Sequence, residues 1–335
     1  MRDSIQPYAV LGAGSWGTAL ALQLARAGNP TLLWAHTPEH CRLMRESRRN
    51  DHYLPGIAFP LTLQPVHDLQ DTIAQVRDIL VVVPSHVFRE TVQSLKPFLT
   101  VQHRLAWGTK GLEQGTRKLL HQIVREELGI TVPVAAVSGP TFALEVARGL
   151  PGAITVASKN NDFAEELAHA LHSEYFLTYT SDDIVGVEIG GAAKNVMAIA
   201  AGIADGMNFG TNTRAALITR GLSEIMRLGV AMGGQRETFM GLSGLGDLVL
   251  TCSDDQSRNR RFGLALGRGM SVEEAHASIN QVVEGIGTAK TVYLLAQDYQ
   301  VNMPITEQVY AVIYEGRSPR EAVQMLLNRM PHPEH

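Results

Sequence analysis

Three glycines near the N-terminus have the spacing of a dinucleotide-binding turn. Gly12, Gly14 and Gly17 fit G-x-G-x-x-G, follow a short apolar run and open a helix-like segment. In that context Gly12 permits a tight turn, Gly14 lets a pyrophosphate approach the backbone, and Gly17 lets helix and strand pack closely. The helix N-terminus offers free N–H groups to the anion. We therefore predict a dinucleotide site; the alternative is a glycine turn in a sheet protein that binds no nucleotide.

The end of the second apolar run bears on which dinucleotide binds. An NAD-only site usually carries Asp or Glu there for the ribose 2′-hydroxyl, whereas this chain has His36 and Thr37. Neither residue is a carboxylate, and neither would repel a 2′-phosphate. We therefore predict NADP(H) and/or NAD(H) as cofactor, with NADPH accepted. Four arginines follow: Arg42, Arg45, Arg48 and Arg49. A solvated helix face is the favoured interpretation of these arginines.

Lys194 lies in a long apolar helix-like segment. Helical spacing places Gly190, Gly191 and Ala198 near the same face, where small residues would let a substrate or a cofactor ring approach the backbone. Desolvation would lower the pKa of such a lysine, which could then exchange a proton with a carbonyl or alcohol oxygen. A lysine that extends from a core helix to solvent fits the spacing equally well.

Polar residues also follow predicted strands and glycine-rich turns. Lys110 follows a strand that ends at Trp107, at the carboxyl edge where ligands bind in open parallel sheets. Gly139 and Thr141 follow the next strand in the same way. Asp247 comes after the glycine-rich segment 241–246, where a helix cap is the alternative interpretation.

Ser257, Arg258 and Asn259 form a small basic and polar cluster. Arginine can bind a phosphate monoester through two N–H groups, although a solvated helix start would have the same composition. Cys252 as a nucleophile is a remote hypothesis, and a buried structural thiol is favoured. The His, Cys and acidic residues show no metal-ligand spacing, so we expect no metal.

The elements that position these residues change in type along the chain. Short strand-like runs separated by helical segments predict a mostly parallel sheet over 8–11, 31–34, 79–83, 104–107, 132–137, 153–157 and 175–179. Beyond about residue 181 only helices are predicted, over 184–204, 213–228, 260–267, 272–279 and 287–298, with two more beginning at Val309 and Arg320. We predict an α/β N-terminal Rossmann-type domain, 1–183, and an all-helical domain, 184–335.

Length and charge narrow the class of protein further. A chain of 335 residues suggests two domains, and a net charge of −4 argues against a nucleic-acid partner. Two cysteines fit a reducing compartment. We expect no signal peptide, a frayed tail at 330–335, and no membrane insertion, because 189–204 is too short to span a bilayer. The prediction is a cytoplasmic protein.

Taken together, these segments resemble the bacterial NAD(P)-dependent glycerol-3-phosphate dehydrogenases over nearly the whole chain. The resemblance rests on their joint order and spacing, including Asn212–Ala215 and Val283-Glu284-Gly285. It implies a fold like that of 6-phosphogluconate dehydrogenase and hydride transfer between dihydroxyacetone phosphate and sn-glycerol 3-phosphate. It also implies a homodimer, and a supply of glycerol 3-phosphate for phospholipid synthesis.

The resemblance assigns roles residue by residue. Lys194 matches the family's proton-exchanging lysine, with Lys110 and Asp247 beside it in the catalytic set. The implied substrate contacts are Lys110, Gly139, Thr141, Lys194, Asp247, Ser257, Arg258 and Asn259. The implied cofactor contacts are Gly12, Gly14, Ser15, Trp16, Gly17, His36, Lys110, Ala143, Arg258, Val282 and Glu284. Many members carry Arg where this chain has His36, which bears on how a 2′-phosphate is held.

Two alternatives from different classes stay open at this point. A β-hydroxyacid dehydrogenase or ketopantoate-type reductase also joins a dinucleotide domain to a helical one, and its substrate carboxylate would suit an arginine. A non-catalytic protein that senses nicotinamide dinucleotides would have no reason to carry Lys110, Lys194 and Asp247 in reactive settings. An assay of dinucleotide oxidation with dihydroxyacetone phosphate separates the three.

Overall fold

The computed structural model describes residues 6–129, 132–279 and 281–328. By their contacts, these residues form two compact units. One comprises the described residues up to Glu113 together with Lys118–Glu188, and the other Gln114–Arg117 and the residues from Ile189 onward. The predicted tail at 330–335 lies outside the described residues.

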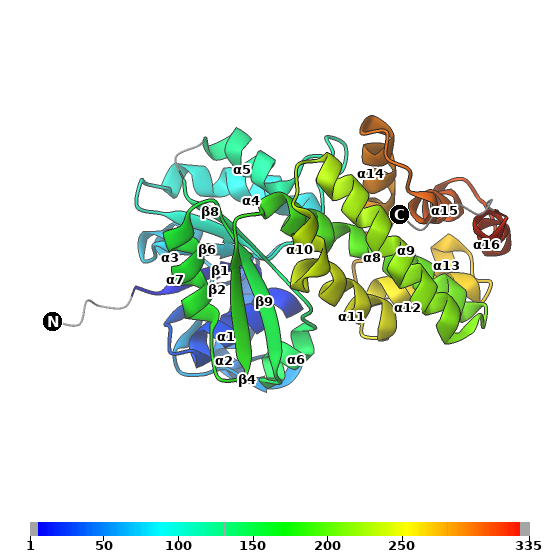
Figure 1. Ribbon diagram of the computed structural model, residues 1–335. Helices are drawn as coiled ribbons and strands as arrows, with labels where there is room; N and C mark the ends of the chain where they lie inside the picture. The colour runs from blue at the N-terminus through cyan, green and yellow to red at the C-terminus, as the bar shows by residue number, and fades with distance from the viewer. Residues whose placement is uncertain (1–5, 130–131, 280, 329–335) are drawn as a thin grey trace. The chain divides into compact units, whose positions relative to one another are not determined.

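The first unit is built on an eight-stranded sheet in the order β10-β9-β8-β7-β6-β1-β2-β5 (Figure 1). All neighbouring strands are parallel except β8 and β9. The strands of this sheet are β1 (Tyr8–Leu11), β2 (Thr31–Trp34), β5 (Leu63–Val66), β6 (Asp78–Val81), β7 (Arg104–Trp107), β8 (Val134–Ser138), β9 (Gly152–Ala157) and β10 (Phe176–Ser181). A separate hairpin pairs β3 (Arg49–Asn50) with β4 (Leu54–Ala58).

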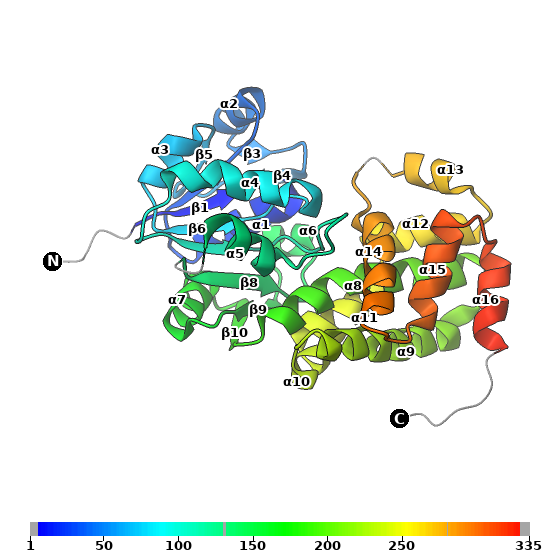
Figure 2. The ribbon, with the colours of Figure 1, turned by 90° about the horizontal axis from the view of Figure 1, so that it is seen from above.

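Helices cover both faces of this sheet because its inner strands are apolar on both sides. Val10 faces a core shared with α1, α2, α6 and α7, while Ala9 and Leu11 face a second core with α3, α4 and α5. Figure 2 shows α4 and α5 lying over the strands. The helices are α1 (Ser15–Arg26), α2 (Pro38–Ser47), α3 (Leu69–Ala74), α4 (Phe88–Leu95), α5 (Leu120–Leu128), α6 (Ala143–Arg148) and α7 (Asn161–Leu171).

The strand order reverses at β1. The chain passes from β1 to β2 on one side, and later enters β6 on the other side of β1. The crevice outside the carboxyl ends of strands at such a reversal is where ligands bind in open α/β sheets. The glycine turn that follows β1 therefore lies where a dinucleotide is expected.

The described part of the second unit is helical, as predicted. Its elements are most of α8 (Ile184–Gly206), α9 (Gly210–Ala231), α10 (Arg236–Met240), a π-helical turn (Leu242–Gly246), α11 (Asp247–Ser253), α12 (Arg258–Gly267), α13 (Val272–Ala277), α14 (Glu284–Asp298), α15 (Pro304–Tyr314) and α16 (Pro319–Leu327). Glycines let α8 and α12 touch: a Cβ on Gly202 would lie 2.1 Å from the Arg260 carbonyl oxygen, and one on Gly263 2.1 Å from that of Ile199.

Helix α8 corrects one expectation. It has 23 residues, about 35 Å at the usual rise, so the expectation that this segment is too short to span a bilayer was wrong. It is the one helix within the described ranges that is long and apolar enough to do so, yet 94% of its apolar window is buried inside the protein. Residue 184 begins α8, but Ile184 and Val187 belong to the core of the first unit, which extends to Glu188.

Candidate active site

In the glycine turn, the protein leaves space for a dinucleotide beside Gly14. Gly12 has φ +116°, and a Cβ there would lie 2.3 Å from the Val82 carbonyl oxygen. A Cβ on Gly17 would lie 1.9 Å from the Gly12 carbonyl oxygen. Gly14 differs, because its φ of −75° suits any residue and a Cβ there meets no atom within 4 Å. That open space beside an α1 N-terminus that no described side chain caps fits a pyrophosphate.

The arginines that follow His36 are mostly engaged by the protein itself. His36 is exposed just beyond β2, its ring centroid 6.0 Å from that of Trp34. Three of the four nearby arginines are engaged by the protein: Arg42 pairs with Glu39 and Glu46, while Arg45 and Arg48 donate to backbone carbonyls. These contacts support their interpretation as structural surface residues. Ser15, at the start of α1, donates to the Tyr53 carbonyl oxygen at 3.1 Å.

Predicted cofactor and substrate contacts meet at the carboxyl ends of β7 and β8. The Trp16 indole N–H donates to the Gly108 carbonyl oxygen at 3.0 Å, and the Lys110 ammonium lies 5.7 Å from the centre of the Trp16 ring. Lys110 Nζ also donates to the Gly139 carbonyl oxygen at 3.0 Å, which Thr141 Oγ1 approaches to 3.2 Å. Lys110 is therefore held beside the glycine turn. Ala143 begins α6 and packs against the sheet core.

In the helical unit, Lys194 forms a buried ion pair. Its Nζ lies 2.5 Å from Asp247 Oδ1 and 2.9 Å from Thr251 Oγ1, and Lys194 and Asp247 are 7% and 1% exposed. Thr251 donates its hydroxyl proton to the Asp247 carbonyl oxygen at 2.6 Å, so it accepts a hydrogen bond from the lysine. This geometry rejects the interpretation of a lysine that extends to solvent, and it places a charged N–H donor against a carboxylate away from water.

One alternative interpretation and one expectation in this region were wrong. The segment before Asp247 is a π-helical turn that continues into α11, so Asp247 is not a cap: the N-cap is Gly246, and the carboxylate bonds Lys194 instead. Gly190 does not leave room for a substrate, because a Cβ there would lie 2.4 Å from the Ser243 carbonyl oxygen. It is small so that α8 can pack against the π-helical turn.

The sequence analysis missed Thr251. The available signal was its spacing, because residues four apart on a helix lie on one face, and Asp247 and Thr251 have this spacing. It went unused because the helix was not predicted: the segment around Asp247 was interpreted as a glycine-rich turn. The hydroxyl–lysine contact joins residues 57 apart in the chain, which no local pattern reveals.

In the proposed phosphate-binding cluster, Ser257 and Asn259 hold the starts of helices, whereas Arg258 is the residue that could bind phosphate. Ser257 caps α12 by accepting from Arg260 N at 3.2 Å, and Asn259 Oδ1 accepts from Gly285 N at 2.8 Å. Arg258 is partly buried, and this burial lowers the pKa of its guanidinium, while Glu284 at the start of α14 acts in the opposite direction. Asn259 thus fixes the start of α14, and Arg258 is the cation of the cluster. Val282 just before α14 is 47% exposed.

Cys252 does not act as a nucleophile in this setting. It is fully buried beside the lysine pair, and burial raises the pKa of its thiol to about 12. A thiolate is the reactive form, so the thiol is inert near neutral pH. This finding speaks against the remote alternative that Cys252 forms a covalent intermediate.

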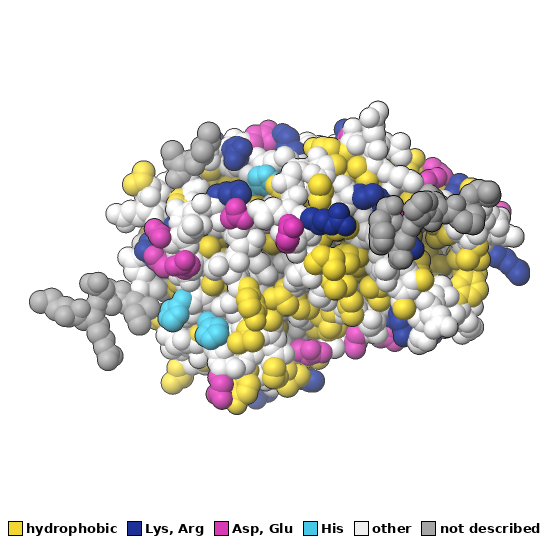
Figure 3. Space-filling model, viewed as in Figure 1, with side chains coloured by type: hydrophobic (Ala, Val, Ile, Leu, Met, Phe, Trp, Pro, Cys, Tyr) yellow, Lys and Arg dark blue, Asp and Glu magenta, His cyan; other side chains and the backbone are white. Residues whose placement is uncertain are grey.

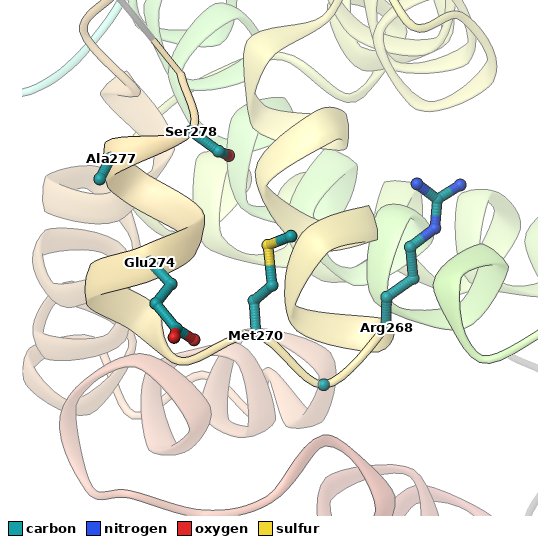
Figure 4. A pocket seen from close by; sticks show the side chains of 6 residues that line it. Arg268, Met270, Glu274, Ala277 and Ser278 are labelled. Carbon is teal, nitrogen blue, oxygen red and sulfur yellow. The ribbon is translucent and has the colours of Figure 1, made fainter.

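The hollow shown in Figure 4 contains none of the predicted site residues. It lies at the turn between α12 and α13 and is lined by Arg268, Gly269, Met270, Glu274, Ala277 and Ser278. Over the residues that the structure describes, no group of three or more His, Cys, Asp or Glu side chains is arranged to hold a metal ion.

The fold and the site together define a class. A Rossmann-type sheet with a glycine turn open to a dinucleotide, followed by a helical unit with a buried lysine–carboxylate pair, is the construction of a nicotinamide-dependent dehydrogenase. Residues 7–164 match the N-terminal part, and residues 183–324 the C-terminal part, of NAD-dependent glycerol-3-phosphate dehydrogenase. The chain belongs to this family.

Individual relatives that carry the name of this family match nearly the whole chain. It is 54% identical over 330 residues to glycerol-3-phosphate dehydrogenase [NAD(P)+] of Mannheimia succiniciproducens, covering 98% of both chains. It is 56% identical to the enzyme of the same name from Nitrosococcus oceani, covering 97% of this chain and 95% of the relative. The crystal structure of glycerol-3-phosphate dehydrogenase from Coxiella burnetii superimposes with a TM-score of 0.93 at 50% identity, covering 97% of this chain and 99% of that chain.

Proposed function

We propose that this chain interconverts dihydroxyacetone phosphate and sn-glycerol 3-phosphate with NADP(H) or NAD(H). The observation that carries the proposal is the buried pair of Lys194 and Asp247, in a member of a family named for this reaction. A buried ammonium is stable only with a counter-charge and hydrogen bonds, and Asp247 and Thr251 supply both. The packing of a helix core does not require such an ion pair, so we infer that it serves the reaction.

We assign separate roles in the reaction to the glycine turn, Lys194 and Asp247. The bound dinucleotide supplies the hydride, held by the turn of Gly12, Gly14 and Gly17 with His36 at its ribose end. Lys194 donates a hydrogen bond to the substrate carbonyl oxygen, stabilises the negative charge that develops there, and gives up its proton. Asp247 keeps the lysine oriented and balances its charge when no substrate is bound.

The remaining proposed contacts orient the phosphorylated substrate. Lys110, with Gly139 and Thr141, forms the substrate contact of the sheet unit, and Arg258 that of the helical unit. A guanidinium can bind two phosphate oxygens at once, which fixes the orientation of the reacting carbon as well as adding affinity. Asn259 places the start of α14, where Glu284 is the proposed cofactor contact.

The decisive experiment is Lys194→Ala in the purified enzyme. Loss of an acid–base group should lower kcat for dihydroxyacetone phosphate by about 10²–10⁴. Dinucleotide affinity, measured by fluorescence titration, should change little, since the glycine turn is intact. Lys159→Ala, at an exposed lysine, is the matched control. Near-normal turnover of Lys194→Ala would remove this residue from the reaction. A wild-type enzyme that turns over ketopantoate in preference to dihydroxyacetone phosphate would contradict the proposed substrate.

We further propose a cytoplasmic homodimer that supplies glycerol 3-phosphate for phospholipid synthesis, without membrane insertion or a nucleic-acid partner. Basic and acidic side chains are interspersed on the face shown in Figure 3, and the chain has a net charge of −4. Neither observation favours a surface for nucleic acid. Sedimentation equilibrium of the full chain measures the oligomeric state.

A further inference from the structure

Asn50 is a buried polar residue of the sheet unit that no step of the proposed reaction uses. It ends β3 of the short hairpin and is 2% exposed. Its amide nitrogen donates to the Ala13 carbonyl oxygen at 2.9 Å and to Thr18 Oγ1 at 2.8 Å. Its Oδ1 lies 2.9 Å from His40 Nε2. Because an amide oxygen only accepts, His40 carries a proton on Nε2, and every polar atom of the Asn50 side chain is engaged.

The two groups to which Asn50 donates lie on either side of the residues proposed to bind the pyrophosphate. Ala13 lies between the first two glycines of the turn, and Thr18 directly follows the third. Thr18 N donates to the Gly14 carbonyl oxygen at 2.9 Å, which closes the first turn of α1. The N–H groups within a first helical turn have no partner inside the helix and are available to an anion. One buried amide therefore holds both ends of this anion-binding stretch.

The bond to Ala13 also sets the direction of the next N–H group. The Ala13 carbonyl and the Gly14 N–H belong to one planar trans peptide and point in opposite directions. When Asn50 holds the carbonyl oxygen, the Gly14 N–H is fixed on the other side of the chain. A peptide group that is already oriented loses less freedom when a ligand binds, so the affinity for that ligand is higher.

The hairpin that carries Asn50 is itself fixed within the sheet unit. Arg48 links α2 to β3 with φ +54°, a left-handed conformation that residues other than glycine rarely adopt. Its guanidinium donates to the carbonyl oxygens of Leu63 and Pro60 at 3.0 and 2.6 Å. The bond from the Ser15 hydroxyl to the Tyr53 carbonyl oxygen is a second tie between this hairpin and α1. The amide is therefore held in place before any ligand arrives.

We propose that Asn50 is a positioning residue for the dinucleotide. Its amide holds the Ala13 peptide and the first turn of α1 in the geometry that binds the pyrophosphate. Asn50 touches no reacting atom, and it acts only through the glycine turn. The inference rests on the proposed function, because the dinucleotide site is part of it.

The test is Asn50→Leu in the full-length enzyme, which replaces the amide by an apolar side chain of similar size. The Kd for NADPH, measured by fluorescence titration without substrate, should rise about tenfold, the change expected when one hydrogen bond to a charged group is lost. The KM for NADPH should rise with it, whereas kcat at saturating NADPH should stay near the wild-type value. A structural role alone would reduce the amount of folded enzyme, and therefore the apparent kcat, and would leave Kd unchanged.

Thr18→Val is the matched control, because it removes the other acceptor of the same amide and leaves the bond to Ala13 in place. Both substitutions leave a buried polar group without its partner, so both should lower the melting temperature. The Kd for NADPH should rise much less in Thr18→Val than in Asn50→Leu. An equal rise in the two variants would show that Kd follows stability and would overturn the inference.

A second variant tests the same amide through a residue that is partly exposed. His40→Phe keeps an aromatic ring beside Tyr53 but removes the N–H group that fixes Asn50 Oδ1, so Kd should rise in the same direction by a smaller factor. If Asn50→Leu did not fold, His40→Phe would decide, and a wild-type Kd in it would overturn the inference. A wild-type Kd in folded Asn50→Leu would do the same. A wild-type enzyme that binds NADPH but does not reduce dihydroxyacetone phosphate would instead refute the proposed function.

Discussion

Asp247 shows why a buried charge pair constrains both stability and chemistry. Its carboxylate is 1% exposed, and the ammonium of Lys194 is its partner at 2.5 Å. Removing one partner of such a pair leaves an uncompensated buried charge, which usually destabilises a protein more than the pair ever stabilised it. The same carboxylate fixes the direction of the lysine, so both properties should fail together when it is neutralised.

Asp247→Asn is therefore expected to destabilise the protein by about 3 kcal/mol in urea unfolding at neutral pH. It should also lower kcat, because the lysine loses its orienting charge. Thr251→Val is the control of similar size, since it removes one hydrogen bond to the same lysine and should cost only about 1 kcal/mol. Equal effects of the two substitutions would show that the carboxylate charge is not what holds Lys194.

At the scale of elements, a buried carboxyl of α9 caps the neighbouring helix α15. Glu224 accepts hydrogen bonds from Ile305 N at 2.7 Å and from Thr306 N at 3.1 Å, two N–H groups of the first turn of α15. These bonds favour the ionised form, but burial outweighs them and raises the pKa of Glu224 from 4.5 to about 7. Because the folded pKa is above the unfolded value, the stability from this group is complete below about pH 4.5 and is lost as the pH rises through 7.

The Glu224→Gln variant isolates this dependence, because its side chain does not titrate. The free energy of unfolding of the wild type minus that of the variant should fall by up to about 3 kcal/mol between pH 4.5 and 8. Carboxyls whose pKa is lowered by arginine contacts, such as Glu166, are present in both proteins and cancel in the difference. Urea unfolding across this pH range measures it. A difference that is flat, or that rises with pH, contradicts the assignment.

At the scale of the whole molecule, the two-part architecture was predictable because each part carries its own repeating pattern. Apolar runs such as 79–83 and the change to helices beyond 181 follow from periodicity alone. The hairpin of β3 and β4 and the edge strand β5 were not predicted, since they are short and contain Pro55 and Pro65. The antiparallel direction of β9 was also not predicted, because strand direction depends on how the chain returns through α6.

The candidate site was predictable residue by residue but not as an arrangement. The glycine spacing and Lys194 were recognisable from local pattern and from the family resemblance. The contacts of Lys194 with Asp247 and Thr251 join residues more than fifty positions apart, and the π-helical turn that aligns them has no sequence rule. The same holds for Gly190, whose small size serves packing against Ser243 rather than substrate access.

The last prediction uses the whole molecule's thermal unfolding to test the dinucleotide site. A ligand at a hundred times its Kd stabilises the native state by about 2.7 kcal/mol, so NADPH should raise the wild-type melting temperature by a few degrees. Gly14→Ala should melt like the wild type without ligand, because its Cβ meets no atom within 4 Å, and should lose most of the shift, because the methyl group occupies the space proposed for the pyrophosphate. Gly12→Ala is the contrast: its Cβ would strike the Val82 carbonyl at 2.3 Å, so it should melt lower even without ligand. If Gly14→Ala kept the full NADPH shift, the pyrophosphate would not lie over this turn.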